Sequence, residues 1–145
     1  MKKMLKKSKG FTLVELLIVV IIIGILAGMM MLSTGGATAK AEATKIVSDM
    51  RNIKAAAIMY YADNSAWVSG DVSLFNTYLD QAISSDKYTV NTSGDRLGYK
   101  GDKMSDQKVK DNLKSLAATG VPLYNADTGT TAYDGSATTV YMPIK

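Results

Sequence analysis

An unbroken apolar stretch near the N-terminus limits the folds open to this 145-residue chain more than any other feature. From Phe11 to Leu32 there are 22 residues, and Glu15 is the only charged one among them. As an α-helix this stretch would extend about 33 Å, which is enough to cross a bilayer core of about 30 Å. We therefore predict a membrane-spanning helix over residues 11–32.

Glu15 is the unusual residue of this helix. A carboxylate inside a membrane costs on the order of a few kcal/mol, so an intramembrane acid generally has a partner. Cleavage of the chain after Gly10 would create one, because the new α-amino group of Phe11 would lie about one helical turn from Glu15. That contact is strained within one chain, but it can form between two parallel helices that are staggered along an assembly axis. The sequence thus predicts a cleaved subunit that polymerises through its apolar helix.

The N-terminal region carries a recognisable signature. Five lysines are followed by Gly10-Phe11-Thr12-Leu13-Val14-Glu15 and the long apolar helix. This arrangement resembles the type IV pilin and type II secretion pseudopilin family, firmly from Lys9 to about Leu32 and more loosely to about Tyr61. The resemblance implies cleavage between Gly10 and Phe11 by a prepilin peptidase, N-methylation of Phe11, and pairing of Glu15 with the N-terminus of a neighbouring subunit. It further implies a homopolymer built by pilus assembly machinery from subunits held in the inner membrane.

The same stretch is open to three other interpretations. A secretory signal has an apolar region of about 7 to 15 residues before a small-residue site, such as Ala37-Thr38-Ala39. Leu16–Leu32 is longer than that, and Glu15 would stand at its front. A plain membrane anchor explains the length and the lysines but leaves Glu15 unpaired. A buried core helix is disfavoured by the length and by the charged flank.

The positive net charge of the chain comes from its first ten residues. The chain contains 17 basic and 13 acidic residues, for a net charge of +4. Without residues 1–10, which contain five lysines and no acid, 12 basic and 13 acidic residues remain, for a net charge of −1. The lysines would hold the N-terminus on the cytoplasmic side of the membrane. We therefore predict no specific nucleic-acid partner, despite a pI of about 9.2.

The sequence contains neither histidine nor cysteine. The absence of histidine removes Ser-His-Asp and Cys-His catalysis and histidine-bearing zinc sites. The absence of cysteine removes the disulfide-closed loop that the family resemblance would otherwise suggest. We predict that the chain is not an enzyme and has no catalytic residue, cofactor or metal site.

We predict an α+β fold in which one long N-terminal helix packs its second half on a small antiparallel sheet. The expected parts are a leader (1–10), a membrane or filament-core helix (11–32), an amphipathic second half of that helix (33–64) and a globular head (65–145). Turn-forming residues at Asp63-Asn64-Ser65 are expected to end the helix. Apolar residues recur every three or four positions before that point, at Ala39, Ala43, Ile46, Met50, Ile53, Ala57 and Tyr60.

Along the head, the spacing of the apolar residues changes from that of a helix to that of strands. A short helix is expected within residues 72–79, and a hairpin is expected from strands at 87–90 and 96–99 around a turn at 91–95. A helix is expected at 106–118, where Gly120 would stop it. Two further strands are expected at 121–124 and 138–142, on either side of a loop.

Several local features invite functional interpretations. Gly24 and Gly28 form a G-x-x-x-G, which either admits a close helix neighbour or reflects ordinary glycine tolerance in membranes. Leu32 stands where most members of the family have proline, and Gly35-Gly36 is the weaker point of the helix, so we predict local unwinding between residues 28 and 36 in the assembled form.

Near the end of the long helix, the aromatic residues Tyr60, Tyr61 and Trp67 are interpreted as core or interface anchors. Asp127 and Asp134 lie in the loop 125–137 and could hold calcium, although turns are often acidic and the spacing of an EF-hand is missing. The sequence Asn91-Thr92-Ser93 matches a glycosylation acceptor, but a match of this length often occurs by chance.

Taken with the resemblance, these features predict the structural subunit of an extracellular type IV pilus filament. Two alternatives remain open. The first is a pseudopilin of a type II secretion or DNA-uptake system, which shares the N-terminal signature. The second is a membrane-tethered binding module, in which the apolar helix is an anchor and forms no filament.

Overall fold

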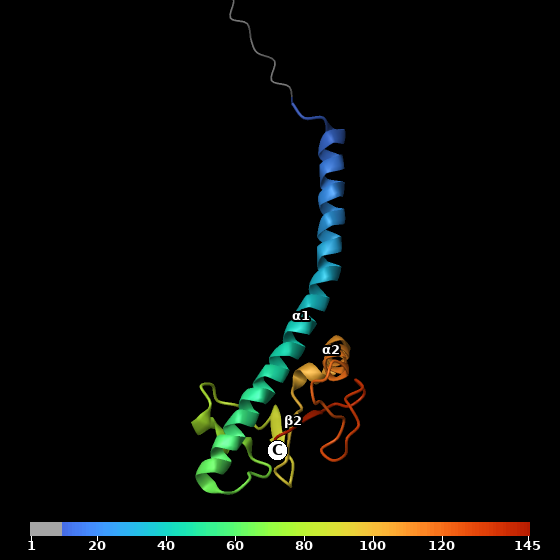
Figure 1. Cartoon of the computed structure of the whole chain (residues 1–145). Helices are drawn as coiled ribbons and strands as arrows, with labels where there is room; N and C mark the ends of the chain where they lie inside the picture. The colour runs from blue at the N-terminus through green and yellow to red at the C-terminus, as the bar shows by residue number, and fades with distance from the viewer. Residues whose placement is uncertain (1–9) are drawn as a thin grey trace, which may run out of the picture. The chain divides into compact units, whose positions relative to one another are not determined.

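The structure of the protein is a computed structural model that describes residues 10–145, apart from the side chains of residues 32 and 33. The predicted leader therefore lies outside the described residues except for Gly10. A long helix and a small antiparallel sheet confirm the predicted α+β class. The elements, in chain order, are α1 (Leu13–Asn64), η1 (Val72–Tyr78), β1 (Tyr88–Val90), β2 (Arg96–Tyr99), η2 (Asp102–Ser105), α2 (Gln107–Ala118) and β3 (Val140–Pro143) (Figure 1).

The described residues form two compact units that divide after Gly36. Helix α1 is continuous across this point, including Gly35 and Gly36. The unwinding expected between residues 28 and 36 concerns the assembled form, so it stays a prediction. The division of the sequence into residues 1–10, 11–32, 33–64 and 65–145 likewise stays a prediction.

The second half of α1 buries the face that its apolar period predicts. Six residues of that face are at most 3% exposed, and Tyr60 packs partly buried against them. The helix ends at Asn64, as expected. Ser65 then has a φ of 53°, in the left-handed region, and its N–H donates to the carbonyl of Tyr61 at 2.7 Å. This backbone reversal stops the helix and starts the connection to η1.

The sheet has the strand order β1-β2-β3, and both neighbouring pairs are antiparallel. The predicted hairpin is present, with Tyr88 opposite Tyr99 and Val90 opposite Leu97. Its turn is organised by Asn91, whose side-chain oxygen accepts the backbone N–H groups of Asp95 and Arg96 at 3.0 Å each. Such asparagine contacts replace backbone hydrogen bonds in turns.

The prediction of a strand at residues 121–124 is wrong. Pro122 has no N–H to donate. The N–H of Leu123 donates to the nearby carbonyl of Val121 at 2.8 Å and so is not available to a strand. Tyr124 alone reaches the sheet, through an isolated bridge to Tyr141. The last strand, expected at 138–142, is observed as β3 at Val140–Pro143.

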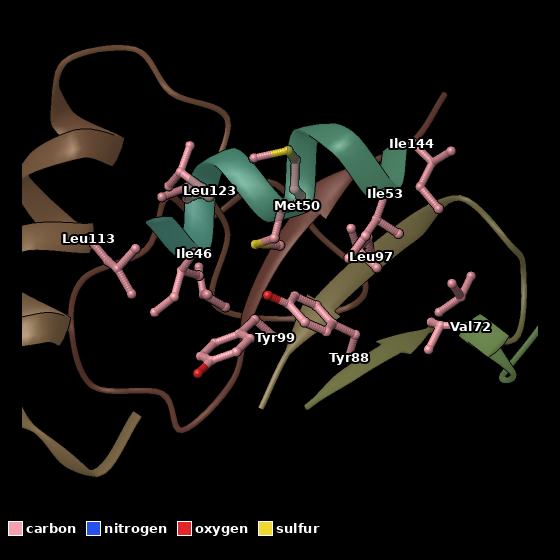
Figure 2. Close-up of a cluster of buried hydrophobic side chains, with 14 of the residues drawn as sticks. Ile46, Met50, Ile53, Val72, Tyr88, Leu97, Tyr99, Leu113, Leu123 and Ile144 are labelled. Atoms are coloured by element: carbon pink, nitrogen blue, oxygen red, sulfur yellow. The ribbon is translucent and has the colours of Figure 1, made fainter. Parts of the chain in front are cut away.

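Side chains from both helices and the sheet meet in one core (Figure 2). Ile46, Met50 and Ile53 of α1 are each at most 3% exposed, and Leu97 of β2 and Leu113 of α2 are fully buried. Asp106 caps α2 by accepting the N–H of Lys108 at 2.9 Å. The predicted helix at 106–118 is thus confirmed, with Asp106 as its cap. Helix η2, which was not predicted from the sequence, adds Met104 to the core.

Candidate functional site

The first part of α1 is a continuous apolar surface. Its large hydrophobic side chains between Leu13 and Met31 are 51–84% exposed in the isolated chain. The helix is long and apolar enough to cross a membrane, with a mean hydropathy of 2.9 in its most apolar window. Because water hydrates such a surface poorly, this part of the helix requires lipid or other apolar helices around it.

The N-terminus of α1 carries a reciprocal cap that involves Glu15. The backbone N–H and the hydroxyl of Thr12 donate to the same carboxylate oxygen of Glu15, at 2.8 and 2.9 Å. In return, the N–H of Glu15 donates to the hydroxyl oxygen of Thr12 at 3.2 Å. This is a capping box, in which a Thr at the N-cap and a Glu three residues later satisfy each other's free backbone donors.

This cap changes one expectation about Glu15. In a plain membrane anchor Glu15 was expected to be unpaired, whereas two hydrogen bonds from Thr12 hold its carboxylate. The spacing Thr-x-x-Glu directly before an apolar run is a known sequence signal for such a cap, so the pattern could have been found without a structure. The cap supplies hydrogen bonds but no positive charge, and the carboxylate remains without a counter-ion among the residues that the structure describes.

The predicted cleavage site lies directly before this cap. Gly10, Phe11 and Thr12 precede the first helical residue and have no regular secondary structure. Gly10 is exposed, and the side chain of Phe11 is 90% exposed. The Gly10-Phe11 peptide bond is therefore sterically open, and the nitrogen of Phe11 is only one residue away from the N–H that Glu15 accepts. The structure thus brings Gly10, Phe11 and Glu15 together at one end of α1.

Gly24 and Gly28 lie on the same apolar part of α1. A Cβ atom placed on either glycine would meet no atom within 4 Å. The surface of the isolated helix is open at this point. The close approach of another helix there stays a prediction.

The loop 125–137 is organised by its own side chains. The carboxylate of Asp134 accepts the N–H and the hydroxyl of Ser136, at 2.9 and 2.6 Å. These contacts hold the pKa of Asp134 below its ordinary value. Asp127 contributes its backbone carbonyl, which accepts the side-chain amide of Asn91. Across residues 10–145, no group of three or more acidic side chains lies close enough together to hold a metal ion.

Asn91 itself is committed to the hairpin. Besides its two backbone contacts, its amide nitrogen donates to the carboxylate of Asp95 at 2.6 Å. Its side chain is partly buried. Its hydrogen bonds support the interpretation of Asn91-Thr92-Ser93 as a turn rather than a glycosylation acceptor.

The aromatic residues at the end of α1 serve the core. The ring of Tyr60 makes edge contacts with Phe75 and Tyr78, with centroid distances of 6.0 and 6.2 Å. Tyr61 stacks on Trp67 with centroids 4.3 Å apart, and Trp67 packs against the core. Tyr60 and Trp67 are thus core anchors, while Tyr61 remains 41% exposed.

Comparisons with known proteins agree with the geometry at the N-terminus. The family described as "Prokaryotic N-terminal methylation motif" matches residues 5–31. A fimbrial protein of Neisseria meningitidis is 31% identical over 148 residues, which cover 91% of this chain and 84% of the relative. The match to the fimbrial protein therefore includes both the apolar helix and the head.

Further relatives match about half of the chain. The type II secretion system core protein G of Vibrio cholerae is 42% identical over 74 residues, covering 51% of this chain and 50% of the relative. The protein of the same name from Klebsiella pneumoniae is 34% identical over 70 residues, covering 48% and 50%. The chain thus spans about half the length of these secretion-system relatives.

The fold has a solved counterpart. The structure of a major type IV pilin from Clostridium difficile superposes with a TM-score of 0.52 and 16% identity, covering 75% of this chain and 98% of the pilin. This likeness confirms the predicted architecture of a long helix on a small sheet. From the methylation motif, the fimbrial relative and this fold, we conclude that the chain belongs to the family of type IV pilins and type II secretion pseudopilins.

Proposed function

We propose that this chain is the structural subunit of an extracellular type IV pilus filament. The observation that carries the proposal is the exposed apolar first part of α1, which a filament of like subunits would bury. Roughly twenty apolar side chains, each stabilising the assembly by about 1.5–3 kcal/mol when buried, outweigh any surface ion pair. The family consists of structural proteins.

The N-terminal residues would then act in order. A prepilin peptidase cleaves the exposed Gly10-Phe11 bond while the apolar helix is in the inner membrane, and the new amine of Phe11 is methylated. Assembly machinery moves the subunit from the membrane into the filament. There, the carboxylate of Glu15 pairs with the N-terminal amine of a neighbouring copy. Since a buried ion pair contributes little net affinity, we assign Glu15 to the register of the helices.

A second candidate function rests on a specific observation. Several relatives are named type II secretion system core protein G, and they match this chain over about half of its length. A pseudopilin would use the same cleavage and the same helix packing, but it would form short, sparse filaments. The fimbrial relative favours the pilus, because it matches 91% of the chain. Filament length and abundance on cells distinguish the two, whereas a membrane-tethered binding module would form no filament.

The first test is the chemical state of the N-terminus. Intact mass and N-terminal sequencing would be measured on the protein from membrane fractions and from sheared cell-surface fractions. We expect a mature chain that starts at Phe11 and is about 14 Da heavier because of one methyl group. A chain that starts at Lys40 would identify a secreted domain, and an uncleaved chain would identify an anchor. Either outcome would overturn the proposal.

The second test concerns Glu15. Replacing Glu15→Ala should leave membrane insertion unchanged and lower the yield of sheared filaments, because the amine of the neighbouring subunit loses its counter-ion. Glu15→Gln is the matched control, since its side-chain oxygen can still accept the hydrogen bonds from Thr12 but carries no charge. If the charge is what matters, both variants assemble poorly. A normal filament yield from Glu15→Ala would contradict the assigned role.

A further inference from the structure

Arg96 carries a buried polar atom that is left without a partner. Its Nη1 is inaccessible to solvent and has no hydrogen-bond acceptor among the residues that the structure describes. In the same part of the chain, the one ion pair joins Lys103 to Glu42, so no carboxylate lies within 4 Å of the Arg96 guanidinium. A buried charge is normally both paired and hydrogen-bonded, because an unpaired one is unfavourable in the interior. Arg96 departs from this rule.

Arg96 lies on the face of the sheet that points away from the core. Side chains alternate between the two faces along a strand, and Leu97 and Tyr99 of β2 belong to the core. Arg96 therefore belongs to the opposite face. There its guanidinium lies over the ring of Tyr124, with Cζ 4.5 Å from the ring centroid. A guanidinium stacked in this way still has its N–H groups available for hydrogen bonds in its own plane.

One of those N–H groups is occupied by a backbone carbonyl. Arg96 Nη2 donates to the carbonyl of Gly129, in the loop 125–137. Gly129 has a φ of 98°, in the left-handed region that favours glycine, and this backbone conformation helps to direct the carbonyl. Two N–H groups of a guanidinium match the paired oxygens of a carboxylate or a phosphate. A carbonyl offers only one oxygen, so Nη2 has an acceptor and Nη1 has none.

The segment that supplies this carbonyl is held to the sheet by side chains of the hairpin. Residues 126–131, here called the strap, are all exposed. Besides the contact with Arg96, the side-chain amide of Asn91 donates to the carbonyl of Asp127 at 3.3 Å. Segments with exposed hydrogen bonds and little buried apolar surface open locally at a low free energy. The strap therefore has the properties of a segment that opens while the sheet stays folded.

We propose that the strap covers a binding site for an oxyanion, and that Arg96 is the residue that binds it. In the closed state, the carbonyl of Gly129 takes the position of one ligand oxygen. When the strap opens, both terminal nitrogens of Arg96 become accessible. Tyr124 still orients the guanidinium, because an isolated bridge joins Tyr124 to Tyr141 of β3. The ligand class is a carboxylate or a phosphate group, whose paired oxygens fit the guanidinium.

Opening also changes the charge around Arg96. Asp127 belongs to the strap and lies close to this face of the sheet, since its charge, after burial, is a cause of the raised pKa of Tyr141. An opening strap takes this negative charge away and so makes the site more favourable to an anion. Asp95 stays in the hairpin, where its carboxylate accepts the side-chain amide of Asn91 at 2.6 Å. This remaining acid opposes polyanions and favours a ligand with a single anionic group.

Hydrogen exchange in the full chain, held in detergent micelles, tests whether the strap opens by itself. The N–H of Asn125 donates to the carbonyl of Thr131 at 3.2 Å, so strap opening exposes it. The N–H of Tyr124 donates to the carbonyl of Tyr141 at 2.8 Å, in the sheet. We expect the amide of Asn125 to exchange at least about tenfold faster than that of Tyr124. Equal rates would show that strap and sheet open together and would overturn the inference.

Two variants separate the guanidinium from the strap. Arg96→Met removes the guanidinium, and an apolar replacement of an incompletely paired buried charge is often tolerated. Gly129→Ala keeps the guanidinium but strains the φ that directs the carbonyl. Each should raise the exchange rate of the Asn125 amide by about three- to tenfold. Arg51→Met, which removes an exposed arginine of α1, is the matched control and should change nothing. Thermal unfolding of each variant identifies any that has lost its fold.

Added anions test the ligand class. Sodium phosphate and sodium acetate would each be compared with sodium chloride at the same pH and ionic strength. An anion that binds only the open state increases the population of that state. We expect phosphate or acetate to raise the exchange rate of the Asn125 amide by about threefold, with the Tyr124 amide unchanged. The anion that gives the larger response identifies the ligand as a phosphate or a carboxylate.

The variants decide whether that response belongs to Arg96. It should persist in Gly129→Ala and disappear in Arg96→Met. No response to either anion, or an equal response in Arg96→Met, would overturn the oxyanion site. The site lies in the head and does not depend on the proposed filament. Absence of filaments would therefore overturn the proposed function and leave the site standing, while a failed exchange experiment would do the reverse.

Discussion

Gly94 lies at the one position of the hairpin turn where both conformation and space demand glycine. Its φ is +65°, and a Cβ atom there would come within 2.8 Å of the carbonyl oxygen of Val68 and of the Cβ of Trp67. Since the obstruction includes backbone, small side-chain movements cannot relieve it. The turn, and with it the contact between the hairpin and the chain before η1, therefore depends on this residue.

Replacing Gly94→Ala should lower the free energy of unfolding by about 2–3 kcal/mol, because it adds a steric contact to an unfavourable φ. Gly120→Ala is the matched control, since Gly120 also has a positive φ, of 99°, but has open space around it. That control should cost only about 1 kcal/mol. Urea unfolding followed by the fluorescence of Trp67 measures both. Equal losses would show that the contact with Val68 is unimportant.

Tyr133 makes the stability of the fold depend on pH in the alkaline range. It is 2% exposed, and its hydroxyl donates to the carbonyl of Ala137 at 2.9 Å. Burial raises the pKa of Tyr133 from 10.0 to about 12, and the nearby carboxylates of Asp134 and Asp111 add to the shift. Because the folded state favours the neutral hydroxyl, this contribution is complete below the unfolded pKa and is lost as the pH rises towards the folded one.

We therefore expect the free energy of unfolding to decrease as the pH rises from 10.0 to about 12. Tyr133→Phe should cost about 1 kcal/mol at neutral pH, through the lost hydrogen bond, and make the alkaline decrease shallower. Urea unfolding at a series of pH values measures this. An unchanged alkaline slope in the variant would show that Tyr133 does not contribute to it.

At the scale of elements, α2 depends on a local cap and on a small buried face. Asp106 accepts the N–H of Lys108, while Val109 and Leu113 are the buried residues of the helix. Asp106→Ala should lower the free energy of unfolding by about 1 kcal/mol, because an N–H at the helix start loses its acceptor. Asp106→Asn should differ from the original by only a few tenths of a kcal/mol, since asparagine caps as well. A loss as large with asparagine as with alanine would assign the effect to charge.

Helix α1 combines two kinds of surface within one element. Its first part is apolar and exposed, and its second part has one buried face and one polar face. Apolar side chains around the whole circumference are typical of a helix in lipid or in a helix bundle, while a single apolar face is typical of a helix on a domain. One continuous helix is therefore suited to two different environments.

The whole molecule should separate into these two parts. Every residue of the buried core lies between Ala39 and Ile144. We therefore expect a chain consisting of residues 37–145 to be monomeric and to unfold cooperatively, because it keeps the core and loses the exposed apolar helix. Analytical ultracentrifugation and thermal unfolding by circular dichroism measure this. A truncated chain without a cooperative transition would show that the apolar part is needed for the fold.

Much of this architecture was predictable because its signals are local. The apolar helix follows from its length and composition, the buried face of α1 from a repeat of three to four residues, and the hairpin from two strands around a turn. The cap between Thr12 and Glu15 is equally local, and its spacing was overlooked. The residues of the candidate site, Gly10, Phe11 and Glu15, were found in the sequence because they adjoin one another in the chain.

Other features depend on residues that are far apart in the sequence. Residues 121–124 were expected to form a strand, but Tyr124 instead bridges Tyr141, and its ring lies 4.5 Å from the guanidinium carbon of Arg96. The pairing of β3 with β2 likewise joins segments more than 40 residues apart. Such pairings are decided by competition for the same hydrogen-bonding edge and core space, which a local pattern does not record.

The sequence by itself determined that this protein has a membrane-length helix with a cleavage and methylation signature. These features depend only on the length of the apolar stretch and on the order of nearby residues, not on how the chain folds. Only the tertiary structure decided which strands pair and which residues of η1, η2 and α2 join the core. These arrangements arise from packing the second half of α1 on the sheet, which brings together some distant segments and separates others.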